Sequence, residues 1–238
     1  MRLQSENIVY NIDVKNLIII PAFNEQACIL NTVREVKEKA PDFDCLVIND
    51  HSSDFTGYIL EQNGIQHVNL PANLGIGGAV QTGYKYAFFN GYDTAVQLDA
   101  DGQHDPSFLK SMLDKMIETD ADMVIGSRFI EKQGFQSSFA RRMGIRYFSG
   151  LIKFLTGKKI TDPTSGLRLA NRKVIEMFAE DYPVDYPEPE STAHILKKGM
   201  KVQEIPVIMR ERQGGKSSIN MKRSVYYMIK VSIAILLA

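Results

Sequence analysis

The stretch TAVQLDADGQHDP, residues 94–106, decides how the rest of this chain is interpreted. Residues 94–98 are mostly apolar and predict a short buried strand, and Pro106 predicts the start of a helix. Asp99 and Asp101 follow the strand directly, one residue apart. Two carboxylates in this position suit a hard divalent cation, which keeps several waters and takes its other ligands from a phosphorylated substrate.

Position singles out this acidic pair, because the chain carries the same pattern at two other places. The aspartate pairs at 42/44 and 120/122 each come before a predicted strand rather than after one. In open α/β sheets, ligands bind outside the carboxyl ends of the strands. The sequence therefore predicts that only Asp99 and Asp101 lie at the functional edge. His104 either binds the cation itself or contacts the residues that bind it.

Composition predicts an ordinary globular chain. Its 238 residues are 44% apolar and 24% charged, which predicts one α/β domain, or one domain with an appendage. A formal net charge of zero gives no overall positive field that would attract nucleic acid. Cys28 and Cys45 are too few for a disulfide scaffold and are interpreted as reduced core thiols in a cytosolic setting. Residues 1–16 lack the apolar core of a signal peptide, and no run reaches the roughly 18 apolar residues of a membrane span.

Hydrophobic patterning predicts strands that alternate with helices. The predicted strands are 17–20, 45–48, 66–70, 94–98 and 122–126, with a last one at 201–210; the predicted helices are around 29–36 and at 56–62, 79–89 and 106–119. This alternation indicates a mostly parallel sheet with right-handed crossovers, flanked by helices.

The glycine-rich turn at 75–78 has two interpretations. It is either a tight turn with close backbone packing, or a loop whose amides approach a nucleotide or phosphate at a helix start. Val80 stands where a dinucleotide fingerprint has its third glycine, and the turn follows the third strand rather than the first. A nicotinamide-dependent enzyme is therefore disfavoured.

Six segments, taken in order, carry a resemblance to a known family. They are PAFNE at 21–25, NDHSSD at 49–54, NLGIGGAVQTGYKYA at 73–87, QLDADGQH at 97–104, GSRF at 126–129 and DPTSGLRL at 162–169. Together they resemble the inverting family 2 glycosyltransferases of the GT-A fold, and among these the polyprenyl-phosphate glycosyltransferases similar to dolichol-phosphate mannose synthase. The resemblance covers about residues 16–218.

The resemblance implies a nucleotide-diphospho-sugar donor, with a UDP-sugar favoured over a GDP-sugar, and Mg²⁺ or Mn²⁺ held by Asp99, Asp101 and Gln103. The implied catalytic residues are Asp99, Asp101, Arg128 and Arg212. The implied donor-binding residues are Pro21, Ala22, Asn24, Glu25, Asp50, Ser52, Asn73, Gly75, Gly77, Gln81, Asp99, Ala100, Asp101 and Lys216. From the residues alone, Glu25 and Asp50 suit either ribose and base contacts after strand ends or local capping.

A basic and apolar segment indicates the acceptor. About residues 137–157, arginines and lysines are interleaved with aromatic and aliphatic residues at helical spacing, and no acidic residue lies between Glu131 and Asp162. The segment is either an amphipathic helix in an anionic membrane interface or a core helix with a solvated basic face. The first interpretation fits a polyprenyl-phosphate acceptor, and the residues expected at its phosphate are Arg128, Arg141, Arg142, Arg146 and Ser165.

Two other functions stay open. A saccharide hydroxyl acceptor would need a carboxylate base from Glu188, Glu190 or Asp162, and the YPVDYPEPE stretch at 182–190 predicts a rigid loop that carries two of these. Alternatively, the chain is a non-catalytic nucleotide-sugar-binding subunit.

The expected organisation is a catalytic domain at 1–218, including a glycine loop at 212–218 that closes over the diphosphate, and an apolar helix at 219–238. This helix is expected at a membrane or against a small membrane protein or a second copy, on the cytoplasmic face of a membrane where polysaccharides or glycans are made.

Overall fold

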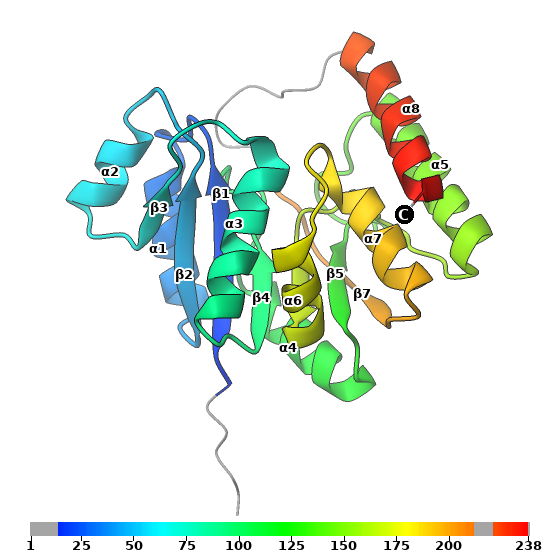
Figure 1. Cartoon of the computed structure of the whole chain (residues 1–238), viewed down its shortest axis with the longest axis horizontal. Helices are drawn as coiled ribbons and strands as arrows, with labels where there is room; N and C mark the ends of the chain where they lie inside the picture. Colours follow the sequence, from blue (N-terminus) through cyan, green and yellow to red (C-terminus); the bar gives the residue numbers. More distant parts are fainter. Residues whose placement is uncertain (1–13, 212–220, 238) are drawn as a thin grey trace, which may run out of the picture.

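A seven-stranded sheet forms the centre of the protein. The computed structural model describes residues 14–211 and 221–237 (Figure 1). The strands are β1 (Asn16–Ala22), β2 (Phe43–Asn49), β3 (His67–Asn69), β4 (Thr94–Gln97), β5 (Met123–Ser127), β6 (Arg168–Asn171) and β7 (Val202–Pro206), in the order β3-β2-β1-β4-β6-β5-β7. The pairs β1–β2, β2–β3, β1–β4 and β5–β7 are parallel, whereas β6 is antiparallel to both β4 and β5.

Helices cover both faces of the sheet, since its central strands are apolar on both sides. Every residue of β1 is buried. Leu17 and Ile19 pack toward α3 (Gly75–Phe89), α6 (Arg172–Glu180) and α7 (Pro187–Lys197), while Ile18 and Ile20 pack toward the opposite face. The helices on that opposite face are α1 (Ile29–Lys39), α2 (Thr56–Gln62) and α4 (Phe108–Thr119). The result is a three-layer α/β/α arrangement (Figure 1).

The expected mostly parallel α/β fold is confirmed. Strand β6 lies between β4 and β5 and runs antiparallel to both. Helix α3 begins at Gly75, four residues before its predicted start, and α4 begins at Phe108 rather than at Pro106. The segment expected as a rigid loop at 182–190 instead enters helix α7 at Pro187, whose fixed φ suits a first helical turn.

Three helices form a layer of their own beside the sheet. Helix α5 (Phe139–Thr156) lies next to α8 (Met221–Leu237), and both contact α7 (Figure 1). The Tyr147 hydroxyl lies 3.1 Å from the Ser232 hydroxyl, and the rings of Phe148 and Tyr227 meet edge to face. Ser138 caps the start of α5 and Gly157, with φ of 71°, ends it. In the part of the chain that the structure describes, no helix is both long and apolar enough to cross a membrane.

Candidate active site

Three adjacent strands bring the predicted acidic residues to one edge of the sheet. Strands β2, β1 and β4 are parallel neighbours, so Asp50, Glu25 and Asp99 all follow carboxyl ends at the same edge. The pair at 120/122 lies at the opposite edge, where the Asp120 carboxylate binds the Lys201 ammonium at 2.8 Å. The choice of Asp99 and Asp101 by position is therefore consistent with the observed topology.

The turn that carries Asp99 and Asp101 is held from several sides. Gly102 reverses the chain with φ of 74°, which a residue with a side chain adopts only under strain. The Asp101 carboxylate accepts a hydrogen bond from the backbone N–H of Gln103 at 3.1 Å. The Thr32 hydroxyl donates to the Ala100 carbonyl at 2.9 Å, and Ala100 itself is buried. The acidic turn is thus a fixed element of the site.

The donor set of this turn fits a hard divalent cation that shares its coordination with a substrate. Within the described residues there is no group of three or more histidine, cysteine or acidic side chains that would hold a metal by itself. Two carboxylates together with waters and diphosphate oxygens are the ligands that Mg²⁺ and Mn²⁺ take in such sites. The side chain of Gln103 donates its amide N–H to the Arg210 carbonyl at 3.1 Å, so its amide oxygen is the atom with which it would ligate.

The loops after β1 and β2 bind each other through residues expected to touch the donor. The Ser52 hydroxyl accepts the Asn24 N–H at 3.0 Å, and the Asn24 amide oxygen accepts the N–H of Ser53 at 2.8 Å. Glu25 donates its N–H to the Thr56 hydroxyl at 2.9 Å. Asn24 and Ser52 therefore position the loops in this structure. Pro21 and Ala22 complete β1 as buried strand residues at the same edge.

Asp50 occupies the helix N-terminus that was one candidate anion site. Its two carboxylate oxygens accept the backbone N–H groups of Leu74 and Gly75 at 2.7 and 2.9 Å, and Asn73 donates its side-chain amide to the Asp50 carbonyl. The Asp50 carboxylate therefore caps the start of α3 in this structure. The approach of these amides to a nucleotide or phosphate stays a prediction.

Gly77 binds the α6–α7 connection, and Gln81 binds the end of α6. The Gly77 N–H donates to the Val184 carbonyl at 3.1 Å, and a Cβ at Gly77 would lie only 2.1 Å from the Pro183 oxygen. The Gln81 side chain donates to the carbonyls of Ala179 and Glu180, each at 3.4 Å. Helix α3 thus uses both residues to hold its neighbours, and their expected contacts with the donor stay predictions.

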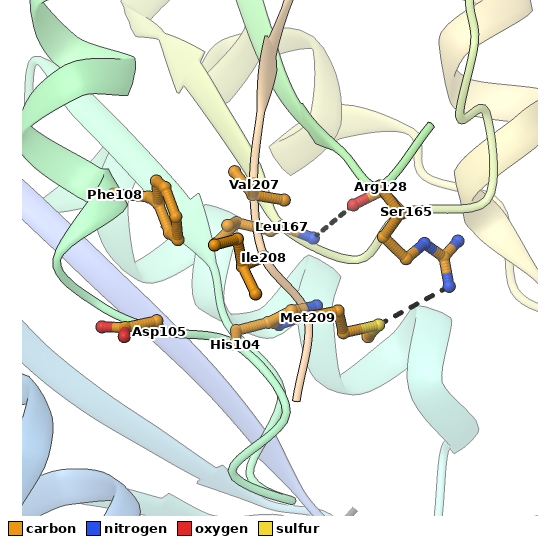
Figure 2. A pocket seen from close by; sticks show the side chains of 9 residues that line it. All are labelled: His104, Asp105, Phe108, Arg128, Ser165, Leu167, Val207, Ile208 and Met209. Atoms are coloured by element: carbon orange, nitrogen blue, oxygen red, sulfur yellow. Dashed lines mark hydrogen bonds between the residues drawn. The ribbon is translucent and has the colours of Figure 1, made fainter. Parts of the chain in front are cut away.

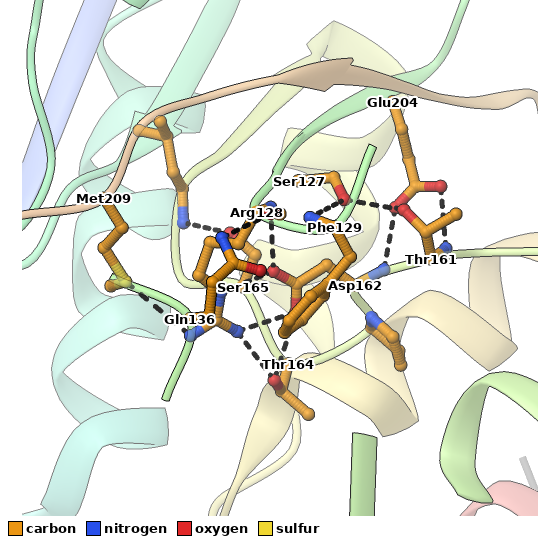
Figure 3. A network of polar contacts seen from close by, with 12 residues as sticks. Ser127, Arg128, Phe129, Gln136, Thr161, Asp162, Thr164, Ser165, Glu204 and Met209 are labelled. Carbon is orange, nitrogen blue, oxygen red and sulfur yellow. Dashed lines mark hydrogen bonds and ion pairs between the residues drawn. The ribbon is translucent and has the colours of Figure 1, made fainter. Parts of the chain in front are cut away.

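Arg128 forms a buried ion pair with Asp162, which Figure 3 shows together with the hydrogen bonds around it. Its Nε and Nη2 donate to the two Asp162 carboxylate oxygens at 2.6 and 2.7 Å, and Nη2 also donates to the Thr164 hydroxyl. Glu204 accepts the backbone N–H groups of Thr161 and Asp162 and so holds the segment that carries Asp162. Burial raises the pKa of Glu204.

This ion pair bears on two expected roles. Arg128 was expected at a phosphate; in this structure its charge is compensated by Asp162 and its side chain is almost fully buried, and the phosphate role stays a prediction. Asp162 was one candidate base, but it is completely buried and bound to a guanidinium. A carboxylate in a bidentate pair with arginine is a poor proton acceptor.

Ser165 is also buried, on the wall of a small cavity beside Arg128 (Figure 2). Its hydroxyl accepts the Leu167 N–H at 3.3 Å. The cavity volume is about 10 Å³, which is room for about one water and not for a phosphate group. Its other walls are largely apolar and include Phe108, Val207 and Met209. The expected contact of Ser165 with the acceptor phosphate stays a prediction.

The three arginines of α5 do not share one face. Arg141 lies on the same side of the helix as the buried Ile145 and Phe148, because residues four and seven apart align. Burial lowers the pKa of Arg141, and Arg128 lowers it further, although the residue as a whole is exposed. Arg146 lies about 140° away around the helix and is exposed, and Arg142 donates to the Ser137 carbonyl at 2.8 Å. Of the three arginines, Arg141 is the one aligned with the buried Ile145 and Phe148.

Glu188, in the first turn of α7, is a second carboxyl group next to the acidic turn. Burial raises its pKa above the ordinary value, the neighbouring Asp99 raises it further, and Arg168 together with a hydrogen bond from Gln97 opposes the shift. Gln97 and Arg168 are register partners on β4 and β6, and Arg168 is fully buried. The sequence analysis did not single out these two residues, although a glutamine and an arginine within apolar strands are a readable signal.

Two predicted residues lie outside the described part of the chain. Arg212 and Lys216, with the glycine loop at 212–218, fall in the range 212–220 that the structure does not describe. Their expected roles at the diphosphate stay predictions.

Comparison with solved structures gives the class of the protein. Glucosyl-3-phosphoglycerate synthase of Mycobacterium tuberculosis, in complex with Mn²⁺, UDP-glucose and phosphoglyceric acid, superposes with a TM-score of 0.71 at 15% sequence identity. The match covers 94% of this chain and 79% of that chain. The fold is therefore the GT-A glycosyltransferase fold.

The family follows from sequence comparison. Residues 17–178 match the model of glycosyl transferase family 2, and the chain belongs to that family. Polyprenol monophosphomannose synthase of Mycolicibacterium smegmatis is 28% identical over 228 residues, which cover 92% of this chain and 86% of that protein. UDP-N-acetylglucosamine–dolichyl-phosphate N-acetylglucosaminyltransferase of Methanococcus voltae is 29% identical over 210 residues, or 80% of this chain and 83% of that protein. The protein is a glycosyltransferase, as its motifs imply, and the non-catalytic alternative is not supported.

Proposed function

We propose that this glycosyltransferase moves a sugar from a nucleotide-diphospho-sugar to a polyprenyl phosphate, with inversion at the anomeric carbon and with Mg²⁺ or Mn²⁺ bound. The observation that carries the proposal is the fixed turn with Asp99 and Asp101, beyond β4 and beside the edge residues Asp50 and Glu25, in a chain of glycosyl transferase family 2. Relatives named for polyprenol and dolichyl-phosphate substrates support the acceptor class.

Each group of side chains has a defined task in this proposal. Asp99 and Asp101, with the amide oxygen of Gln103, would hold the cation at the diphosphate. The cation, when bound, neutralises charge on the departing nucleoside diphosphate. Glu25 follows β1 at the same edge and is proposed to bind the ribose or base. Asp50 both caps α3 and presents its carboxylate to this side of the site.

A phosphate acceptor removes the need for a general base. The second pKa of a phosphate monoester is about 6, so the attacking oxygen is already largely ionised at neutral pH. What the acceptor needs is a cation to hold it, and Arg141 is proposed for this task because it is aligned with the buried residues of α5. Arg141→Gln is expected to raise the KM for polyprenyl phosphate about tenfold or more, since a charge-assisted hydrogen bond is lost. The matched control is Arg146→Gln, on the exposed side of the same helix.

Glu188 supports a second acceptor class. Its position next to Asp99 and its raised pKa are features of a carboxylate that can act as a general base. If the acceptor is a saccharide hydroxyl, Glu188→Gln lowers kcat by about 100-fold or more while the KM for the donor stays the same. If the acceptor is a polyprenyl phosphate, the variant keeps a kcat within a few-fold of the native value.

The exposed sides of α5 and α8 form a surface that suits a membrane. Large apolar residues are exposed along both helices, and we call them the apolar face: Met143, Tyr147, Phe154, Ile229 and Ile233. Arg146 and Lys153 are exposed beside them. Apolar and basic side chains together favour the interface of an anionic bilayer. We place the protein at the cytoplasmic face of such a membrane, with α8 as an interfacial helix after the catalytic domain of residues 1–218.

Membrane binding is measured by co-sedimentation with vesicles that contain anionic lipid. The double variant Phe154→Ser and Ile233→Ser is expected to bind at least about tenfold more weakly, because two apolar side chains no longer enter the interface. Phe89→Ser is the matched control, since Phe89 is 78% exposed at the end of α3, outside this layer. An equal loss of vesicle binding in Phe89→Ser would contradict membrane binding through the apolar face.

Transfer itself is tested with a panel of labelled UDP- and GDP-sugars, Mn²⁺, and undecaprenyl phosphate in detergent. We expect lipid-linked product from a UDP-sugar and none in EDTA. Full transfer in EDTA contradicts the metal, and product formed only with saccharide acceptors contradicts the lipid phosphate.

A further inference from the structure

His104 contacts the acidic turn through a hydrogen bond to the backbone. Its Nδ1 accepts the N–H of Asp99 at 3.3 Å, across the turn formed by the residues between them. The Asp99 carboxylate is farther from the same nitrogen, at 4.0 Å. The stronger contact of the ring is therefore with the main chain of Asp99 and not with its side chain.

The N–H of Asp99 has no partner within the sheet. The last backbone bond of this strand region joins the Leu98 N–H to the Ile19 carbonyl at 3.0 Å, and the β1–β4 register ends at Gln97. Asp99 is the next residue, between the buried Leu98 and Ala100, and without His104 its amide would lack that acceptor. A buried amide without an acceptor is costly, so the imidazole completes the end of β4.

The ring is fixed in place and in tautomer. His104 is 4% exposed, and within the described part of the chain its Nε2 has no hydrogen-bond partner. It forms part of the wall of the small, mostly apolar cavity beside Arg128 (Figure 2). Because Nδ1 accepts a hydrogen bond, it carries a lone pair, and the proton of the ring is on Nε2.

The Asp99 side chain is confined from the other direction as well. A Cβ at Gly166 would lie 2.8 Å from one Asp99 carboxylate oxygen and 3.1 Å from the other, so the main chain at Gly166 closely approaches the carboxylate. The main chain of Asp99 is thus fixed by His104, while its carboxylate is limited by Gly166. Residues that orient a metal ligand without touching the metal affect metal affinity strongly.

We propose that His104 is a positioning residue for the metal-binding turn, and that it sets the direction of the Asp99 carboxylate by accepting the Asp99 N–H. This inference rests on the proposed role of Asp99 and Asp101 in binding the cation. It assigns His104 no contact with the metal or the substrate.

Three variants separate this role from mere packing. In His104→Asn the carboxamide oxygen reaches the place of Nδ1, so the acceptor is kept. In His104→Gln the amide reaches the place of Nε2 instead, and His104→Phe has no acceptor. Asparagine and glutamine have the same polar group, so the comparison between them depends on where the acceptor lies.

The first measurement is Mn²⁺ binding in the presence of UDP, followed by the loss of the free Mn²⁺ signal in electron paramagnetic resonance without any acceptor. We expect His104→Asn to stay within about threefold of the native affinity, and His104→Gln and His104→Phe to bind about 10- to 100-fold more weakly. Equal affinities of the asparagine and glutamine variants would overturn the inference. If the phenylalanine variant does not fold, the comparison of His104→Asn with His104→Gln still tests the positioning role.

The second measurement needs no metal. Nitrogen NMR of the metal-free protein should show His104 with its proton on Nε2, and the Asp99 amide should exchange at least about tenfold more slowly than in His104→Gln. A proton on Nδ1, or unchanged exchange in the glutamine variant, would refute the positioning role. If the native protein does not bind Mn²⁺ with UDP, the proposed function fails, and the NMR result alone decides on His104.

Discussion

The ion pair between Arg128 and Asp162 allows a quantitative test of how the site is supported. Asp162→Ala removes four hydrogen bonds to that carboxylate, of which three come from Arg128 and one from Thr164. It also leaves a guanidinium buried without its partner. Breaking such a pair typically costs about 3–5 kcal/mol, which is a large share of the roughly 5–15 kcal/mol that stabilises a domain.

The assay is urea unfolding at neutral pH, followed by circular dichroism. We expect Asp162→Ala and Arg128→Met each to lower the free energy of unfolding by about 3 kcal/mol or more. The double variant should cost less than the sum by about 2 kcal/mol, because neither charge is then left alone.

The opposite result would restore Arg128 as a phosphate ligand. Single variants that cost under about 1 kcal/mol, as exposed ion pairs do, would show that the pair contributes little to the fold. If such a stable Arg128→Met variant also lost transfer activity, the guanidinium would act on the substrate, and the structural role given to it here would be wrong.

Two further predictions concern residues around the acidic turn. The pKa of Glu188 is raised in the fold, so the unfolded chain loses this proton first as the pH rises above about 4.3. We therefore expect the native protein to lose stability relative to Glu188→Gln as the pH rises from that value. A difference in urea midpoint between the two proteins that does not change with pH would contradict the burial of this carboxyl. Gly77→Ala is expected to destabilise by about 2–3 kcal/mol, because its Cβ would meet the Pro183 oxygen at 2.1 Å. Gly150→Ala is the control; its Cβ meets nothing within 4 Å, so thermal melting should show a gain of about 0.5–1 kcal/mol there, and equal losses would refute the close contact.

Local patterning predicted the parts of the fold that depend on local sequence. The run at 17–20 predicted a strand, and β1 occupies it and is buried throughout. The position of Asp99 and Asp101 after an apolar strand predicted the functional edge, because parallel strands bring their carboxyl ends together. The place of β6 between β4 and β5 and its antiparallel direction were not predicted, because both depend on pairing across the chain.

The roles of single polar residues were less predictable, because long-range partners decide them. Asp50 was expected at a ligand, and the structure shows it 24 and 25 residues from the amides it caps. Arg128 and Asp162 are 34 residues apart, and no local pattern indicates that they pair. A charged side chain after a strand can face a ligand or another loop, and only the packed structure distinguishes the two.

Metal binding by Asp99 and Asp101 is tested most directly by titrating Mn²⁺ and UDP into the native protein, Asp99→Asn and Asp101→Asn in an isothermal titration calorimeter. We expect the native protein to bind UDP much more tightly with Mn²⁺ than in EDTA. Each asparagine variant should lose about 100-fold or more of the Mn²⁺-dependent affinity, because a carboxylate ligand is lost, while its melting temperature in EDTA stays near the native value. Equal Mn²⁺-dependent affinity in the native protein and both variants would show that these carboxylates do not bind the cation.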